Sequence, residues 1–323
     1  MTPSADLDIL AKALAWLEQG KAPLLVTVVA TWGSSPRPAG SLLAMCAGGL
    51  HAGSVSGGCV EEDLFRRLGA GEWNKLCQPA LLSYGVDKEE ANRFGLPCGG
   101  QLDLLIEPIL AESHWLALYE WAASGQTVLR IMEAASGEAR IQISNDPAIP
   151  AFSFGNGLMH KVFGPQWRML LIGANHLARY VAQFAQALDY QVLVCDPREN
   201  YLAQWDMAGT VCLREMPDDA VRALEHYRRS IILTLTHDPK LDDMALMEAL
   251  ELDAFYVGAL GSQRSSDQRR KRMRMLDIAP EKIDRLHAPV GMAIGSRTPA
   301  EIAIAIMADI TAQRNQAGAY ARR

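Results

Sequence analysis

Four short apolar runs in the second half of the chain limit its possible folds more than any other feature. They lie at 169–172, 191–194, 230–235 and 255–257, and stretches with helical periodicity separate them. Alternating strands and helices place successive strands parallel, with each helix crossing back over the sheet. This half is therefore predicted to form a Rossmann-like, doubly wound parallel sheet of the α/β class.

The first half of the chain has a different pattern. Apolar residues at helical spacing predict a helix over 5–20, and a second helix is expected over 112–123. Runs rich in β-forming residues predict strands at 24–31, 41–45, 54–55, 80–84, 101–106, 127–132 and 140–143. We therefore expect an N-terminal mixed α+β domain.

The boundary between the two patterns is predicted from 145–157, a segment with two prolines, two glycines and little periodicity. We expect a linker region over 145–166 with the boundary near 156–166, an N-terminal domain over 1–155 and a C-terminal Rossmann-like domain over 156–323. A chain of 323 residues is long enough for two such domains.

Charge and composition argue against several classes of function. A net charge of −6 disfavours nucleic acid as a partner, because proteins that bind its phosphate backbone need clustered cations in excess. The first residues show no basic stretch before an apolar run, and no window approaches the ~18 continuous apolar residues of a membrane span. The six cysteines form no C-x-x-C pair, so reduced thiols and a cytoplasmic location are expected.

The clearest phosphate-binding candidate in the second half is the turn from Gly173 to His176, with Asp196 at the end of the next predicted strand. Such a turn offers helix amides to a phosphate, and an acid ~20 residues later can bind a ribose hydroxyl. Asn175 stands where the fingerprint has its second glycine. The sequence therefore leaves two alternatives open, a nucleotide site or a βαβ unit that binds nothing at this turn.

A second turn runs from Gly258 through Ser262 and Arg264 to Ser265, after the last predicted strand. Backbone amides and a guanidinium in this turn are suited to an anionic group. The basic run that follows, 269–272, is predicted to be a solvated helix face.

Two further features lie near the end of the chain. His287 precedes a loop of turn residues and polar groups, and a ligand contact or a hydrogen-bonded structural histidine explains it equally well. Thr298-Pro299-Ala300-Glu301 predicts a capping box at the start of an apolar helix.

The sharpest candidate in the first half is the loop Cys98-Gly99-Gly100. A cysteine between a proline and two glycines lies on a turn whose amides are open to a ligand, which a buried core cysteine would not need. A soft thiolate at Cys98 suits molybdenum or a sulfur-bearing ligand better than a hard cation.

Two other loops of this half carry weaker candidates. Cys59 follows Gly58 at a predicted helix start, a position that favours a thiolate, but the acidic residues 61–63 oppose it. Ser35 and Arg37 lie in a proline-rich loop whose hydroxyls, guanidinium and neighbouring tryptophan suit a heterocycle that carries phosphate.

Seven segments together resemble the xanthine dehydrogenase accessory factor (XdhC/CoxI-like) family, and they span about 24–310. They are TVVATWGSSPRPAGSLLA, GSVSGGCVEEDL, FGLPCGGQLDLLIEP, LLIGANHLARYVA, VCDPRE, YVGALGSQRS and LHAPVGMAIGSRTPAEIAIAIMADI. The resemblance implies a chaperone that binds molybdenum cofactor, as molybdopterin or its cytosine dinucleotide form. It also implies that the chaperone supports sulfuration of the cofactor with a cysteine desulfurase, and its insertion into a molybdenum hydroxylase of the xanthine dehydrogenase/aldehyde oxidase type.

The resemblance also assigns roles to residues. Cys59 and Cys98 match the family's Gly-Gly-Cys and Cys-Gly-Gly cysteines, and Cys98 is the implied contact with cofactor molybdenum or sulfur. The implied pterin or phosphate contacts are Arg37, Gly258, Ser262, Arg264 and His287. Asn175 replaces a glycine that is usual in the family.

Two other functions stay open from the sequence. Gly173 and Asp196 are compatible with an NAD(P)-dependent oxidoreductase, and a non-catalytic docking scaffold would need no working pocket. No acid–base pair lies near the cysteine loops, so we assign no catalytic residue and expect a maturation factor rather than an enzyme. A homodimer is expected, because dimers are the commonest state of soluble oligomers.

Overall fold

The computed structural model describes residues 5–32, 37–85, 101–110, 114–144, 146, 149–224 and 228–320. The chain divides into two compact units, and the division follows Pro165. Each unit has hydrophobic cores of its own. None of the helices in the described ranges combines the length and the apolar composition needed to span a bilayer.

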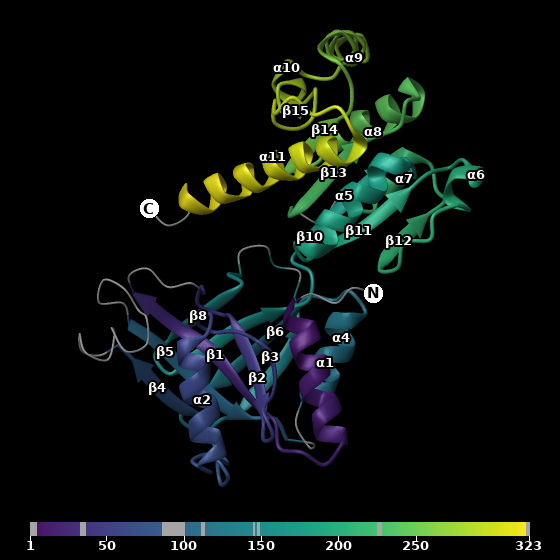
Figure 1. The fold of residues 1–323 in the computed structure, drawn as a ribbon. Coiled ribbons are helices and arrows are strands. Elements are labelled where there is room, and N and C mark those ends of the chain that lie inside the picture. The colour runs from purple at the N-terminus through teal and green to yellow at the C-terminus, as the bar shows by residue number, and fades with distance from the viewer. Residues whose placement is uncertain are drawn as a thin grey trace. The chain divides into compact units, whose positions relative to one another are not determined.

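The first unit is a mixed α+β domain (Figure 1). Its described elements are α1 (Ala5–Glu18), β1 (Leu24–Trp32), β2 (Leu42–Cys46), β3 (Leu50–Gly53), α2 (Cys59–Gly69), β4 (Ala80–Tyr84), β5 (Gln101–Pro108), α4 (Trp115–Ala123), β6 (Val128–Glu133), β7 (Ala139–Ile143), β8 (Phe152–Gly155) and β9 (Leu158–Phe163). Two antiparallel sheets result, with strand orders β3-β2-β1-β5-β4 and β7-β6-β9-β8.

Both faces of the five-stranded sheet are covered. On one face, Val26 of β1 packs in a core with Val60 and Leu64 of α2. On the other face, Leu25 of β1 packs in a core with Leu10 of α1 and with residues of α4. Successive strand side chains point to opposite faces. This two-sided burial explains why β1 is mostly apolar along its length rather than alternating.

The range 145–166, expected as a linker, contains the hairpin β8–β9, and the division after Pro165 lies within the boundary region expected at 156–166. The strands turn at Asn156 and Gly157, which both have positive φ, of 50° and 77°. An Asn-Gly pair in that geometry is a strong hairpin signal, and the surrounding prolines and glycines obscured it. β9 pairs with β6 as well as β8, so residues 156–165 belong to the first unit rather than the second. A strand was also expected at 54–55, but β3 ends before it.

The second unit is a doubly wound parallel sheet, as predicted. Its described elements are β10 (Trp167–Ile172), α5 (His176–Ala187), β11 (Tyr190–Cys195), α6 (Glu199–Leu202), β12 (Thr210–Leu213), α7 (Pro217–Arg222), β13 (Ser230–Thr234), α8 (Pro239–Glu251), β14 (Tyr256–Ala259), α9 (Gln263–Met275), α10 (Pro280–Ile283), β15 (Leu286–His287) and α11 (Pro299–Tyr320). The strand order is β12-β11-β10-β13-β14-β15, and every pair is parallel. In order of appearance within the unit this is 3-2-1-4-5-6, the Rossmann order.

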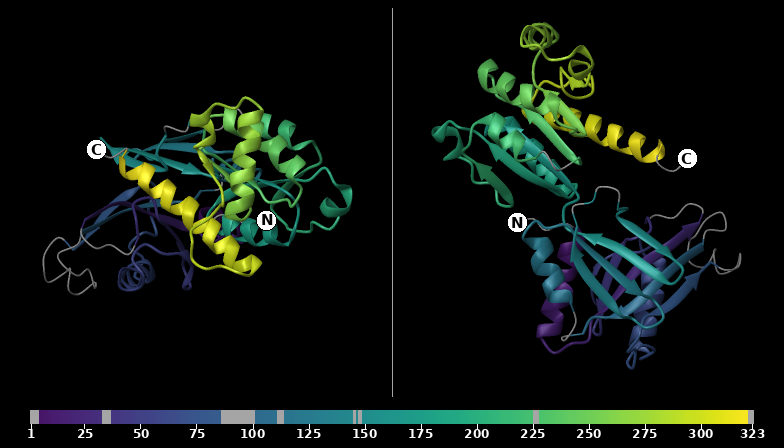
Figure 2. Two further views of the ribbon diagram at one scale, coloured as in Figure 1. Left: turned by 90° about the horizontal axis from the view of Figure 1, so that it is seen from above. Right: turned by 180° about the vertical axis from the view of Figure 1, so that it is seen from behind.

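Helices cover both faces of this sheet. Residues of α5 and α11 share one core with the strands, and residues of α7, α8, α9 and α10 share the other. Figure 2 shows α11, in yellow, from two further sides. The carboxyl ends of the parallel strands meet along one edge, and the strand order reverses between β10 and β13. Ligands of doubly wound sheets bind at this edge.

Candidate functional site

The turn after β10 begins at Gly173. A glycine is required at this position because the turn packs closely against the segment that follows β13. Gly173 has a φ of 111°, and its N–H donates to the carbonyl oxygen of Cys195 at 2.8 Å. A Cβ atom at Gly173 would lie 2.9 Å from Cγ2 and 3.2 Å from the backbone nitrogen of Thr236. The glycine therefore brings the turn against the end of β13.

Replacing Gly173 by alanine should lower the free energy of unfolding by about 3 kcal/mol, because a positive φ and an overlap with Thr236 act together. Gly295 in the same unit has a φ of 77°, and a Cβ atom at this position would have no other atom within 4 Å. Gly295→Ala should therefore cost only about 1 kcal/mol. Urea titrations of both variants measure the difference, and equal losses would contradict the packing role of Gly173.

Asn175 closes the turn by capping helix α5. Its Oδ1 accepts from the N–H of Ala178 at 2.9 Å, and its Nδ2 donates to the carbonyl oxygen of Leu235 at 2.7 Å. One of the amides that a Rossmann turn offers to phosphate is therefore bonded inside the protein. His176 is exposed at the start of α5, with its ring 5.0 Å from that of Tyr180.

Asp196 lies at the end of β11, and its carboxylate is fully buried. Oδ2 accepts from the N–H of Ala174 at 2.9 Å and from Nη2 of Arg198 at 2.8 Å. Oδ1 accepts from Nε of Arg198 at 2.8 Å. Burial acts to raise the pKa of Asp196, but these hydrogen bonds outweigh it and hold the pKa below its ordinary value. A ribose contact at Asp196 stays a prediction, and it would require these bonds to open.

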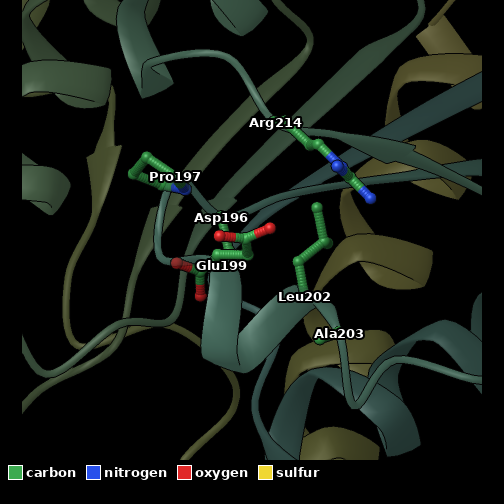
Figure 3. A pocket seen from close by; sticks show the side chains of 6 residues that line it. All are labelled: Asp196, Pro197, Glu199, Leu202, Ala203 and Arg214. Atoms are coloured by element: carbon green, nitrogen blue, oxygen red, sulfur yellow. The ribbon is translucent and has the colours of Figure 1, made fainter.

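A pocket of about 240 Å³ lies beside Asp196 at the carboxyl ends of β11 and β12. Its lining residues are Asp196, Pro197, Glu199, Leu202, Ala203 and Arg214. Figure 3 shows Arg214, which directly follows β12, above Leu202 and Ala203 among the side chains that line the pocket. Glu199 and Arg214 are exposed, and neither side chain has a hydrogen-bond or ion-pair partner among the residues that the structure describes.

The second predicted turn divides into a packed part and an exposed part. Gly258 lies inside β14, where a Cβ atom would approach Val290 Cγ2 to 2.7 Å and Leu233 Cδ2 to 2.9 Å. Its glycine is therefore explained by packing in the sheet. Ser262 caps α9, and its Oγ accepts from the N–H of Ser265 at 3.2 Å. Arg264 is exposed in the first turn of α9.

The prediction that the basic run 269–272 is a solvated helix face is wrong for Arg269, which is 5% exposed. Its Nη2 donates to Asp242 Oδ2 at 3.0 Å, and its Nη1 donates to the carbonyl oxygen of Leu260 at 3.1 Å. Burial raises the pKa of Asp242 to about 6, against the effect of the Thr236 hydroxyl and the Arg269 charge. Arg269 thereby ties α8 to the start of the loop that carries Ser262.

His287, at the end of β15, has structural partners. Its ring stacks on that of Tyr256, with centroids 4.0 Å apart and planes 14° apart. Nδ1 lies 3.8 Å from Oδ2 of Asp309, which also accepts from the Tyr256 hydroxyl at 2.6 Å. Burial lowers the pKa of His287, and the Asp309 charge opposes this.

The predicted capping box is present, with Glu301 Oε2 accepting from the N–H of Thr298 at 2.9 Å.

In the first unit, the loop before α2 is built around the carboxylate of Glu61, which accepts six hydrogen bonds. The donors are the hydroxyls of Ser54 and Ser56 and the backbone N–H groups of Val55, Ser56, Gly57 and Gly58. Burial acts to raise the pKa of Glu61, but the hydrogen bonds outweigh it and hold the pKa well below its usual range. The loop delivers Cys59 to the first position of α2.

Several predicted site residues lie outside the described residues, namely Cys98, Gly99, Gly100 and Ser35. Cys59 is described by its backbone alone, and Arg37 is exposed. Within the described ranges, no group of three or more His, Cys, Asp and Glu side chains is placed to hold a metal ion. The structure brings Gly173, Asn175, His176 and Asp196 together at the carboxyl edge.

The sequence predictions did not include Glu199, Arg214 and Glu61. Arg214 directly follows a strand, so the rule that places ligands at strand ends would have found it if β12 had been predicted. Glu61 was treated only as an opposing charge, although a glutamate three residues after Gly58 is the spacing of a capping box.

Two family models match the chain. The model of the "XdhC Rossmann domain" matches residues 169–310, and the model of the "XdhC and CoxI family" matches residues 16–84. A solved structure described as a xanthine dehydrogenase from Bacillus halodurans has a TM-score of 0.74 at 22% identity, over 96% of both chains. This likeness shows the fold.

Three curated relatives align along most of the chain. A protein of Bacillus subtilis (strain 168), described as a probable subunit of xanthine dehydrogenase, is 24% identical over 94% of this chain and 96% of its own length. The "Molybdenum cofactor insertion chaperone PaoD" of Escherichia coli (strain K12) is 25% identical over 95% and 88%. The "Uncharacterized protein YqeB" of the same strain is 27% identical over 94% of this chain, which spans only 46% of the YqeB length.

Proposed function

Since this chain belongs to the XdhC and CoxI family, we propose that it binds molybdenum cofactor as a cargo and supports its insertion into a molybdenum hydroxylase of the xanthine dehydrogenase type. The function in the name of PaoD, molybdenum cofactor insertion, supports this proposal, because the alignment with PaoD includes both units. The cargo is molybdopterin or its cytosine dinucleotide form.

In this proposal the chain protects the cofactor in the cytoplasm, as a homodimer, while a cysteine desulfurase supplies sulfur for its sulfido ligand. Cys98, in the Cys-Gly-Gly loop, is the proposed contact with the molybdenum or its sulfur, because a thiolate is a soft ligand. Gly99 and Gly100 would let backbone amides approach the cargo.

The observation that carries the proposal is the loop before Cys59. The Glu61 carboxylate accepts hydrogen bonds from six donors of this loop. Asp63 accepts from Arg66 and from the Tyr84 hydroxyl. Both carboxylates therefore stay ionised, and each is held by hydrogen bonds from its own unit. The loop thereby holds residues 57–59, the Gly-Gly-Cys sequence that the resemblance implies as a cargo contact, at the start of α2.

Mass spectrometry of the small molecule that copurifies from a molybdate-replete host tests the proposal. We expect molybdopterin or its cytosine dinucleotide form with the native chain, and loss of most of it with Cys98→Ala. Cys77→Ala is the matched control, because Cys77 is an exposed free cysteine of the same unit, and it should retain the cargo.

Two results would remove the proposal. The first is a native chain that carries no pterin from such a host. The second is a Cys98→Ala variant that still matures the hydroxylase to full activity.

The alternative of an NAD(P)-dependent oxidoreductase loses support at the turn after β10. Asn175 bonds one amide of that turn and the Asp196 carboxylate is saturated, whereas nicotinamide dinucleotides use these groups in Rossmann folds. Calorimetry with NAD and NADP would revive this alternative if either bound. A docking scaffold would instead mature the hydroxylase with a variant that cannot bind cargo.

A further inference from the structure

The pocket beside Asp196 has the size of one nucleoside rather than of a whole dinucleotide. Its volume is about 240 Å³, below the ~300–1,000 Å³ of sites that enclose a drug-sized ligand. It lies where β11 and β12 end, at the ligand-binding edge of the sheet. A ligand would therefore place one end in this pocket and extend along the edge.

The pocket lining has an apolar part and a charged part. Leu202 and Ala203 supply an apolar wall, while the carboxylate of Glu199 and the guanidinium of Arg214 have no partner among the described residues. Asp196 is bonded to Ala174 and Arg198 and contributes no unpaired oxygen. A free carboxylate matches the hydroxyls of a ribose, and a guanidinium matches a phosphate.

The turn after β10 has fewer free amides to offer a phosphate than a glycine-rich Rossmann turn has. In a glycine-rich Rossmann turn, the amides at the start of the first helix bind the pyrophosphate. Here the side chain of Asn175 already accepts from the N–H of Ala178. Arg214 follows β12, which lies on the other side of β11 from β10 in the sheet. It offers an exposed cation for the phosphate.

We propose that this pocket binds a ribonucleoside monophosphate unit, with Glu199 accepting from the ribose hydroxyls and Arg214 binding the phosphate. The inference rests on the proposed function in one respect, that a cytosine dinucleotide cargo would carry such a unit as its cytidine end. The adenosine half of a nicotinamide dinucleotide has the same chemistry. The base therefore identifies the source.

Calorimetry on the full chain with CMP, AMP, dCMP and inorganic phosphate tests the pocket. We expect CMP to bind, more tightly than AMP if the source is the cargo and less tightly if it is a nicotinamide dinucleotide. Arg214→Ala should weaken nucleotide binding at least tenfold, which is the loss of affinity typical of one charge-assisted contact. Inorganic phosphate alone should bind far more weakly.

The role of Glu199 has a readout of its own. The native chain should prefer CMP to dCMP by about tenfold, because the deoxy form lacks one hydroxyl donor. Glu199→Ala should remove this preference, which a merely structural role of Glu199 would not do. Both variants should melt as the native chain does, since both side chains are exposed.

Arg228→Ala is the matched control, because Arg228 is also exposed but precedes β13, at the amino edge of the sheet. It should bind nucleotide as the native chain does. The proposal is overturned if neither CMP nor AMP binds, if Arg214→Ala or Glu199→Ala has no effect, or if inorganic phosphate binds as well as the nucleotides.

Failure of this inference and failure of the proposed function are distinguishable. A chain that copurifies with molybdopterin but binds no nucleotide retains the function and loses the pocket. A chain that binds nucleotide in this pocket but carries no pterin retains the pocket and loses the function.

Discussion

Replacing Arg130 by methionine should lower the free energy of unfolding of the first unit by about 3–5 kcal/mol, because it leaves the Glu107 carboxylate buried without its partner. Arg130 is 2% exposed and Glu107 is 4% exposed. Nη1 and Nη2 of Arg130 donate to the two carboxylate oxygens at 3.1 and 2.6 Å. The guanidinium also lies 4.1 Å from the ring centroid of Trp115.

His114 completes this cluster, and its neutral state matters. Its Nε2 accepts from Nε of Arg130 at 2.7 Å. Burial and the Arg130 charge lower the pKa of His114 to about 4, so the ring stays neutral at pH 7 and can accept. The Arg130 guanidinium is therefore bonded on three nitrogens inside the unit.

Urea denaturation at pH 7 measures the loss, and two variants control it. Lys12→Met breaks the exposed Lys12–Asp8 pair of the same unit, and it should change little because exposed pairs contribute little. The double variant Arg130→Met with Glu107→Leu should recover much of the loss, since it removes both charges. A single Arg130→Met variant as stable as the native chain would show that the pair is not buried in solution.

Glu61→Gln should cost the first unit about 3 kcal/mol at pH 7, because the buried carboxylate accepts charge-assisted hydrogen bonds that contribute about 1.5–3 kcal/mol each. The six donors around the carboxylate would face an amide whose NH₂ group is itself a donor. Only the oxygen side of the amide can replace the lost bonds. The loop that delivers Cys59 should lose its order as well.

Glu61→Gln should also change how the free energy of unfolding depends on pH. The pKa of Glu61 in the folded protein lies well below the ordinary value of 4.5, so the stability that it contributes is complete above pH 4.5. That stability is lost as the pH falls toward the folded pKa. The difference between native and Glu61→Gln proteins should therefore shrink on acidification below pH 4.5.

Glu62→Gln is the matched control for this experiment, because Glu62 is the next residue along α2 and is exposed. It should leave the urea midpoint nearly unchanged at every pH. If Glu61→Gln and Glu62→Gln proved equally stable, the loop would not depend on the Glu61 carboxylate.

The sequence was sufficient to predict the strands that have long apolar runs. β10, β11 and β13 are buried on both faces, so each is a continuous run, and their alternation with helices indicated the parallel sheet. β12 was missed because only four residues form it, at the edge of the sheet, and two of them are exposed. A short edge strand leaves no apolar run to detect.

The candidate site could be predicted only in part, because side-chain partners are set by the fold. The position of Asp196 at a strand end was predictable, but its saturation by Ala174 and Arg198 depends on the turn geometry. Arg269 looked like one more residue of a basic run. Its partner Asp242 lies 27 residues earlier, and no local pattern indicates that pairing.

The hairpin β8–β9 has a consequence for how proteins of this family could exchange parts. β9 ends at Phe163 and β10 begins at Trp167, so only residues 164–166 separate a strand of the first unit from a strand of the second. A recombination joint placed at 155 would strip β9 from between β6 and β8 and leave both strands with an open edge. Natural or engineered chimaeras that swap the Rossmann unit should therefore be viable only when they are joined within these three residues.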